Sequence, residues 1–258
     1  MKLLRGLRVG STLSTVRVRR ALVVVPMLAA LGAAAGCDGT GVPIAASTSG
    51  AVASAAAEPG GVVTPKAASV TLAKKELAAE RVATIPGKLA SYEREKFGDA
   101  WSDAAKGVAD AGNGCDTRND ILRRDAVSGT VRTKTGTTGC KVTAGTWVSP
   151  YTGATFTSKA QIQIDHIVPL GRAWASGAKD WPAARRLAFA NDPDNLVAVD
   201  GHSNQSKGDK GPSAWKPAQP YQCLYAVRYL KSLTKYRLPI TASDKTALTT
   251  MLAGCKAA

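Results

Sequence analysis

The sequence lacks the features that mark several common classes of protein. It has no CxxC pair, no internal repeat of roughly 20 to 50 residues and no apolar run of the about 20 residues that span a membrane. These absences disfavour a structural zinc site, a solenoid and a transmembrane span. Aromatic residues make up 5% of the chain, and only two of its 258 residues are His. A hydrolase that uses an imidazole group therefore has few candidate residues.

Acidic residues are absent from the first 36 residues, which contain six basic residues and an apolar run at 21–31. A basic start, a short apolar run and a stretch of small residues are typical of an export signal. The segment AAGC at 34–37 resembles the lipobox of bacterial lipoproteins, so Cys37 is a candidate lipidation site. Ordinary cleavage nearby, or a twin-arginine signal at 19–20, is an alternative. Each predicts an exported protein, extracellular or held at the cell surface as a lipoprotein.

Charged and aromatic residues are nearly absent from residues 38–68, where Ala, Gly, Ser, Thr, Val and Pro dominate. Such a stretch buries too little apolar surface to offset its chain entropy, so we expect a flexible tether. The predicted organisation is a signal peptide at 1–36, a flexible linker at 37–69 and a folded domain at 70–258.

Acidic residues are also the minority in the chain as a whole. There are 34 Lys and Arg residues against 19 Asp and Glu, a net charge of +15, and removal of the six basic residues of the signal leaves about +9. A positive excess suits a polyanionic partner, whose phosphates would be contacted without reading of the base sequence. The same charge would suit an anionic cell envelope.

Four cysteines remain when Cys37 is set aside: Cys115, Cys140, Cys223 and Cys255. An even number in an exported chain predicts two disulfides, with three possible connectivities. Proximity in the sequence favours Cys115 with Cys140 and Cys223 with Cys255, but the spacing alone does not decide between them. A zinc site is the alternative, and the two His residues do not have the spacing that it needs.

Helical and strand patterns alternate in the predicted domain. Amphipathic helices are expected at 72–82, 89–101, 182–190, 221–236 and 243–252. Strands are expected at 130–134, 142–146, 161–166 and 196–199. Helices outnumber strands, and the strands are expected to pair as hairpins and not through helical crossovers. The pattern therefore predicts an α+β fold.

The segment QIQIDHIVPL at 161–170 contains one of the two His residues, His166. Alternation along a strand places Gln161, Gln163 and Asp165 on one face, with His166 at the strand end. Adjacent Asp and His side chains normally diverge. At a strand end next to a turn, however, Asp165 and His166 can converge on one centre.

A second short strand begins at Asn195, 29 residues after His166, and a polar segment follows it. Asp165 and His166, then Asn195, then Asn204 nine residues later and Lys207 three further on have the spacing of the ββα-metal motif. The segment resembles HNH endonucleases, with Asn204 where the family name implies His. The wider resemblance, over about 70–258, is to secreted HNH nuclease-like proteins whose domain is also found at the C-terminus of GmrSD-type restriction enzymes. It is carried by residues 92–101, 113–120, 150–153 and 189–192 and by the Cys-bearing tail.

The resemblance implies a metal-dependent endonuclease with an α+β fold built on a ββα core. It implies that His166 is the general base and that Asp165 and Asn204 bind one divalent ion, Mg²⁺ or Mn²⁺. Asn195 would shape the loop and hold the imidazole by a hydrogen bond.

Two basic residues are candidates for contact with the nucleic-acid backbone. Lys207 would lie on the same helical face as Asn204, and Arg118 is the less direct candidate. The partner implied is nucleic acid, DNA in preference to RNA. The chain is expected to be a monomer without a small-molecule cofactor, in contact with a membrane only through an N-terminal lipid anchor.

Each candidate residue has a structural alternative. A helical Lys such as Lys207 is usually just solvated, an Arg beside an Asp is usually a structural pair, and His166 would otherwise be a satisfied core residue. His202 lies seven residues after Asn195 and not nine, roughly 200° from the ligand face of a helix. Tryptophans flank the motif, and a place in the core is favoured over base stacking: Trp174, Trp181 and Trp215.

Two other functions remain open at this point. One is a catalytically silent HNH scaffold that binds nucleic acid or an anionic envelope polymer. The other is a phosphodiesterase that acts on another polymer, such as teichoic acid. The intact set of Asp165, His166, Asn195 and Asn204 argues against the silent scaffold.

Overall fold

The computed structural model describes residues 64–87, 89–134 and 139–256. The predicted signal peptide, Cys37 and most of the predicted linker lie outside these residues. In the part of the chain that is described, no helix is long and apolar enough to cross a membrane.

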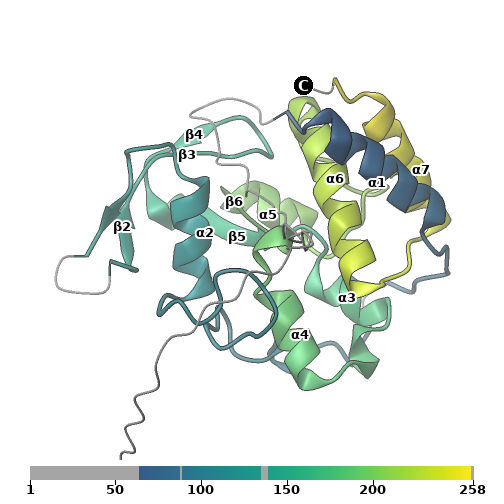
Figure 1. The fold of residues 1–258 in the computed structure, drawn as a ribbon, viewed down its shortest axis with the longest axis horizontal. Helices are drawn as coiled ribbons and strands as arrows, with labels where there is room; N and C mark the ends of the chain where they lie inside the picture. Colours follow the sequence, from purple (N-terminus) through teal and green to yellow (C-terminus); the bar gives the residue numbers. More distant parts are fainter. Residues whose placement is uncertain (1–63, 88, 135–138, 257–258) are drawn as a thin grey trace, which may run out of the picture. The chain divides into compact units, whose positions relative to one another are not determined.

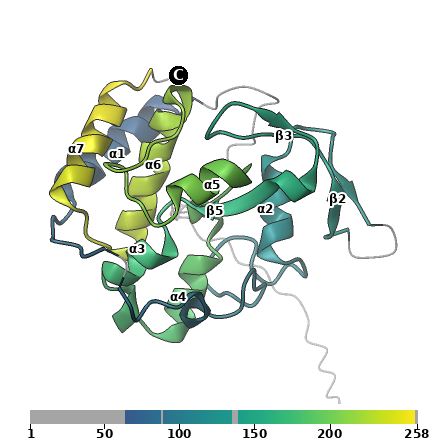
Figure 2. The same cartoon turned by 180° about the vertical axis from the view of Figure 1, so that it is seen from behind.

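Three helices lie side by side at one end of this region: α1 (Ala67–Ala79), α6 (Gln219–Tyr236) and α7 (Ala242–Ala253) (Figures 1 and 2). Their facing sides bury apolar residues such as Tyr225 and Leu248, both fully buried. This cluster is called the helical core below, and it also includes Val197 and Val199.

Short strands and one helix lie at the other end (Figure 1). Strand β1 (Arg132–Thr133) pairs with β2 (Val142–Ala144), and β3 (Trp147–Val148) pairs with β4 (Thr155–Phe156), both antiparallel. Helix α2 (Thr117–Asp125) begins where the Asp116 side chain accepts a hydrogen bond from the Asn119 amide. The buried residues of this end form a second cluster, called the sheet core: Ile121, Leu122, Ala126, Val142, Trp147, Ile162, Ile164, Leu196 and Ala198.

A two-stranded antiparallel ribbon separates the two cores. It consists of β5 (Ile162–His166) and β6 (Leu196–Asp200), with Asp165 opposite Val197 and His166 opposite Leu196. Val197 belongs to the helical core and Leu196 to the sheet core. Because directly opposed residues share a face, Asp165 faces the helical core and His166 the sheet core.

Helix α5 (Gly201–Lys207) follows β6 without a loop and runs beside β5 (Figure 2). It begins at Asp200, whose carboxylate accepts hydrogen bonds from the Ser203 amide at 2.8 Å and from the Ser149 hydroxyl at 2.7 Å. The first bond caps the helix, and the second ties its start to the residue after β3.

The connection between the central strands contains four helical elements: α3 (Leu170–Ala175), η3 (Ala178–Asp180), α4 (Ala183–Ala190) and η4 (Pro193–Asn195). The β5–β6 pair is therefore antiparallel but is not a hairpin, because these helical elements lie between its strands. The other two 3-10 turns are η1 (Arg94–Phe97) and η2 (Lys159–Gln161).

The α+β fold class is confirmed, and α4, α6, α7 and the central strands lie where the sequence predicts them. The helix predicted at 89–101 is wrong, because the segment contains only the turn η1. Leu89 packs against the helical core and Trp101 against the sheet core, so the segment crosses between the cores. Positive φ angles at Gly98 and Trp101 are incompatible with a helix. The sequence analysis missed α2, α3, β3 and β4.

Both disulfides join the cysteines that are nearest in the sequence. Cys115 bonds to Cys140 and fixes the start of α2 to the segment before β2, and Cys223 of α6 bonds to Cys255 after α7. The pairing favoured by proximity is thereby confirmed.

Loss of either disulfide should destabilise the fold, because each closes a loop that is open in the reduced unfolded chain. With sequence separations of 25 and 32 residues, we expect Cys115→Ser with Cys140→Ser, or Cys223→Ser with Cys255→Ser, to lower the free energy of unfolding by about 2–4 kcal/mol. Urea unfolding measures the change, with mass spectrometry of unreduced, alkylated protein as the control. Four freely alkylated thiols in the native chain would contradict this pairing.

Candidate active site

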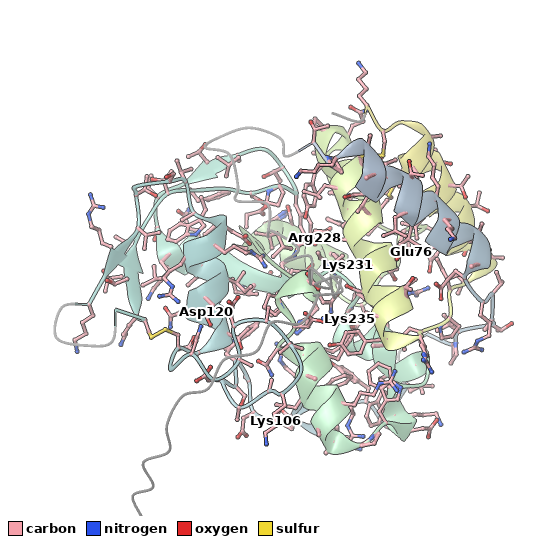
Figure 3. All side chains as sticks on the ribbon, viewed as in Figure 1. Glu76, Lys106, Asp120, Arg228, Lys231 and Lys235 are labelled. Carbon is pink, nitrogen blue, oxygen red and sulfur yellow. A yellow bond between two sulfur atoms is a disulfide. The ribbon has the colours of Figure 1, made fainter. Side chains whose placement is uncertain are left out.

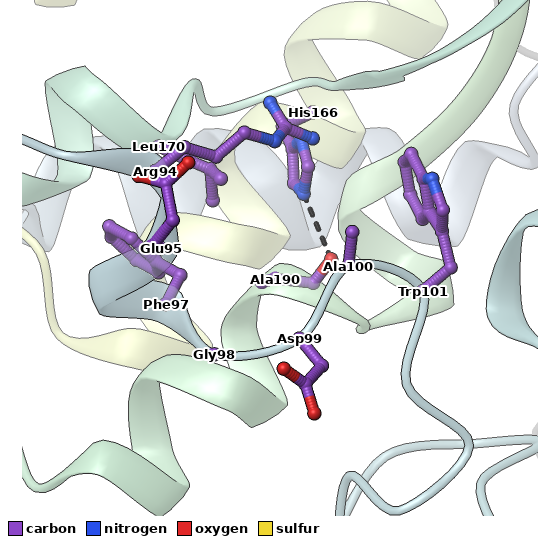
Figure 4. A pocket seen from close by; sticks show the side chains of 10 residues that line it. All are labelled: Arg94, Glu95, Phe97, Gly98, Asp99, Ala100, Trp101, His166, Leu170 and Ala190. Atoms are coloured by element: carbon purple, nitrogen blue, oxygen red, sulfur yellow. Dashed lines mark hydrogen bonds between the residues drawn. The ribbon is translucent and has the colours of Figure 1, made fainter.

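His166 is the last residue of β5, and 6% of it is exposed. Its Nε2 lies 2.9 Å from the Ala190 carbonyl oxygen at the end of α4 (Figure 4). A carbonyl oxygen only accepts, so Nε2 carries the proton and the neutral ring has its lone pair on Nδ1. Burial and the positive charges of Arg94 and Lys207 lower the pKa of His166 to about 3, although the bond to Ala190 acts in the opposite direction.

A cavity of about 230 Å³ opens beside the imidazole. It is lined by residues 94–95 and 97–101 together with His166, Leu170 and Ala190 (Figure 4). The Trp101 ring stacks against the imidazole, with ring centroids 6.0 Å apart and planes inclined by 12°. The segment 94–101 therefore forms one wall of the cavity and His166 lies in another.

Asp165 lies on the opposite face of the ribbon and is held by two neighbours. Lys207 Nζ lies 2.9 Å from Asp165 Oδ2 and 3.1 Å from Oδ1, and it also donates to the His166 carbonyl oxygen at 2.8 Å. The Tyr151 hydroxyl donates to Oδ2. Burial raises the pKa of Asp165 and lowers the pKa of Lys207, and their mutual contact opposes both shifts.

Asn204 lies on α5 above the same face as Asp165. Its Nδ2 donates a hydrogen bond of 2.8 Å to Oε1 of Gln163, two residues before Asp165 on β5. Asn204 is half-buried, whereas His202 is exposed. The helix therefore turns Asn204, and not His202, toward the ribbon, as the nine-residue spacing predicts.

The structure does not bring Asp165 and His166 onto one centre. Strand β5 continues through His166, which still has a ladder partner on β6, so the alternation of side chains applies to both residues. Asp165 contacts Tyr151 and Lys207, whereas His166 contacts Ala190 and Trp101. The two sets of side chains lie on opposite faces of the ribbon.

Asn195 shapes the turn after His166 but does not hold the imidazole. Its Oδ1 accepts a hydrogen bond from the Val168 amide at 2.9 Å, and its Nδ2 donates to the Val168 carbonyl oxygen at 3.2 Å. Asn195 is fully buried, and these bonds occupy its amide group. The Ala190 carbonyl oxygen fixes the ring in its place.

The two basic candidates lie away from the cavity. Lys207 is fully buried in its ion pair, and Arg118 donates to the Ile162 carbonyl oxygen at 3.0 Å, at the opposite end of β5 from His166. Neither meets a phosphate at His166 in this arrangement. The flanking tryptophans belong to the helical core or pack against it, as the sequence analysis favoured: Trp174, Trp181 and Trp215.

The donor chemistry of Asp165 and Asn204 fits a hard divalent ion, since both offer oxygen ligands. Within the described residues nothing donates to Asn204 Oδ1, but Asp165 Oδ1 accepts a hydrogen bond from Lys207, and Oδ2 lies 2.9 Å from the same ammonium. Those residues also contain no group of three or more His, Cys, Asp and Glu side chains that could hold a metal. An ion bound here would have to share Asp165 with the ammonium of Lys207, or displace it.

Comparison with known proteins gives one match to a protein family. A family model described as "GmrSD restriction endonucleases, C-terminal domain" matches residues 116–251, more than half of the chain. The chain belongs to this family. A curated relative from Arthroderma benhamiae, named "Uncharacterized secreted protein", is 42% identical over 167 residues, which are 64% of this chain and 76% of the relative. No solved structure matches the chain.

Membership of the GmrSD C-terminal domain family accounts for the ribbon and α5, which lie inside the matched range. The cavity wall at 94–101 lies before that range. The sequence analysis gave no role to Arg94 or Trp101, because it predicted a helix at 89–101 and nothing in a helical pattern places this segment beside His166. The single signal of its position was the wider resemblance at 92–101.

Asn195→Ala should destabilise this family member strongly, because it leaves the amide and the carbonyl oxygen of Val168 without partners in a buried turn. We expect the free energy of unfolding to fall by about 2–3 kcal/mol in urea. The matched control is Asn204→Ala, where a half-buried side chain with one hydrogen bond should cost less than about 1 kcal/mol. Equal losses in the two variants would contradict this role for Asn195.

Proposed function

We propose that this chain is an exported endonuclease that hydrolyses phosphodiester bonds of nucleic acid, with His166 as the general base. The family gives a nuclease-like domain of the HNH type. The observation that carries the proposal is the His166 imidazole, which borders a cavity with its tautomer set by the Ala190 carbonyl oxygen.

Phosphodiester hydrolysis needs a group that removes a proton from the attacking water as the new bond to phosphorus forms. In the tautomer that donates through Nε2, Nδ1 of His166 is the atom that would accept this proton. The Asn195 bonds to Val168 and the Lys207 bond to the His166 carbonyl oxygen hold the backbone on both sides of the imidazole. A base held in this way loses little entropy on reaching the transition state.

Charge and chemistry favour nucleic acid as the substrate. Removal of the six basic residues of the predicted signal leaves a net charge of about +9, and a polyanion gains affinity from such an excess. Asp165 and Asn204 are the residues that would hold Mg²⁺ or Mn²⁺ through oxygen ligands, and such an ion would supply positive charge on the face of the ribbon opposite to His166. A different phosphodiester polymer is separated from nucleic acid by the cleavage assay below.

Two observations support export. The chain has two disulfides, and disulfides persist in oxidising compartments. The relative from Arthroderma benhamiae is named as a secreted protein. Lipid attachment at Cys37, a residue outside those the structure describes, and the monomeric state stay predictions.

His166→Ala should abolish cleavage while the fold and the affinity for DNA stay nearly unchanged. A lost general base should lower the rate by about 10² to 10⁴. The assay follows initial rates on plasmid DNA, single-stranded DNA and RNA in Mg²⁺, Mn²⁺ or EDTA, and His202→Ala is the matched control because His202 is exposed. A rate for His166→Ala within a few-fold of the unmodified chain would reject the assignment. Binding without any cleavage by the unmodified chain would indicate the silent scaffold.

Substitutions at Asn204 and at His202 should have opposite effects on the metal dependence of cleavage. Asn204→Ala should lose activity and respond less to Mg²⁺, because it removes one of the two proposed ligands, whereas His202→Ala should stay active. Asn204→His should keep partial activity with a preference shifted toward Mn²⁺, since imidazole is a softer ligand. Initial rates across metal concentrations decide between them. An inactive His202→Ala beside a normal Asn204→Ala would mean that the ligand set must be redrawn around His202.

A further inference from the structure

Arg94 is the basic residue of the cavity beside His166. Its side chain is exposed, and its guanidinium carbon lies 6.0 Å from the centroid of the Trp101 ring. Within the described residues it forms no ion pair with a carboxylate. Figure 4 shows the Arg94 side chain extending toward the imidazole, and its charge acts on His166. A cation without an acceptor therefore borders the proposed base.

Other basic side chains near the central ribbon are already engaged. Arg228 donates to the carbonyl oxygens of Pro193, Asp194 and Leu196. Lys231 and Lys235, which follow Arg228 along one side of α6 in Figure 3, pair with Asp194, and Lys235 also pairs with Asp192. Lys207 is buried against Asp165. These residues stabilise the protein, and their charges are offset within it.

Trp101 holds a conformation that is costly for an aromatic residue, with φ at +59°. Its carbonyl oxygen accepts a hydrogen bond of 3.2 Å from the Thr117 amide at the start of α2, close to the Cys115–Cys140 disulfide. The Trp101 ring contacts the imidazole on one side of the cavity and the guanidinium of Arg94. The tertiary structure thus fixes an aromatic ring near both the base and the cation.

We propose that Arg94 binds the phosphodiester group and that a water molecule deprotonated by His166 attacks this group. We further propose that Trp101 is a positioning residue for Arg94 and His166. This inference rests on the proposed nuclease function and names the side chain that receives the substrate phosphate. A guanidinium offers a planar set of donors that matches two phosphate oxygens, and it keeps its charge at every working pH. The two acids of the same segment, Glu95 and Asp99, do not offset this charge by contact, and the Asp99 carboxylate points away from the imidazole in Figure 4.

Binding is measured with the full chain carrying His166→Ala, so that the DNA stays intact. In this background Arg94→Ala should weaken binding of a labelled DNA duplex about tenfold and reduce the slope of log affinity against log salt concentration by about 0.9, the value of one lost phosphate contact. Arg94→Lys should restore the slope, since it keeps the charge, but only part of the affinity, since it loses the planar fork.

The matched control is Arg81→Ala, which removes an exposed guanidinium that has no side-chain hydrogen bond or ion pair among the described residues. It should leave the affinity and the salt slope unchanged. If Arg94→Ala and Arg81→Ala give the same slope, the proposal for Arg94 is overturned. An unmodified chain without measurable affinity for DNA would overturn it as well.

Trp101 is tested by steady-state kinetics in the chain with an intact His166. Trp101→Ala should lower kcat at least tenfold with an unchanged salt slope of binding, because the base and the cation lose their common support, and Trp101→Phe should restore most of kcat. A normal kcat for Trp101→Ala would overturn the positioning role. If the unmodified chain binds DNA through Arg94 but cuts no substrate, the proposed nuclease function fails while the phosphate site stands.

Discussion

The buried ion pair between Lys207 and Asp165 is the contact on which the rest of the site depends. Lys207 is the last residue of α5, and its ammonium donates hydrogen bonds to Asp165 Oδ1 and to the carbonyl oxygen of His166, while Asp165 Oδ2 lies 2.9 Å away. One side chain therefore fastens the helix to β5 at the residue that carries the imidazole. Removal of one partner from such a pair leaves an uncompensated buried charge and typically costs about 3–5 kcal/mol. The ion pair is thus a structural element of the ββα unit, although both residues have the chemistry of a catalytic site.

This pair also determines which face of the ribbon is available for catalysis. Asp165 is covered by Lys207 and Tyr151 on the side of the helical core, so the open cavity is left to the other side, where His166 lies. The turn after β5 is also held in place, because Asn195 forms hydrogen bonds with the backbone amide and the carbonyl oxygen of Val168. The position of the imidazole is therefore set by backbone contacts and by the Ala190 carbonyl oxygen.

Local patterns were enough to predict the ribbon, α4, α6 and α7, because their apolar residues repeat with the period of the element that buries them. Local patterns did not predict the structure of the segment 89–101, because its apolar residues pack against two different cores. They did not predict α2 either, because this helix has few apolar residues and is stabilised by its Asp116 cap and a disulfide. The motif spacing agrees with Asn204, and not His202, facing the ribbon, while the role of Asn204 as a metal ligand stays a prediction. It could not show that Asp165 and His166 diverge, since that depends on whether β5 ends before or after His166. Which basic residues are buried is likewise a tertiary property.

The distribution of positive charge follows from the same tertiary packing. Lys207 forms a buried ion pair with Asp165. Arg124 and Arg228 donate hydrogen bonds to backbone carbonyl oxygens at the start of β6 and in the turn before it. Among the described residues, Arg94 is the basic side chain that lines the cavity beside His166, and it is the proposed partner of a phosphate there. A divalent ion at Asp165 would stand on the far face of the ribbon and beside the ammonium of Lys207, whose like charge opposes its binding. Because Lys207 also holds the His166 carbonyl oxygen, any movement of its ammonium away from Asp165 would be transmitted directly to the backbone that carries the base.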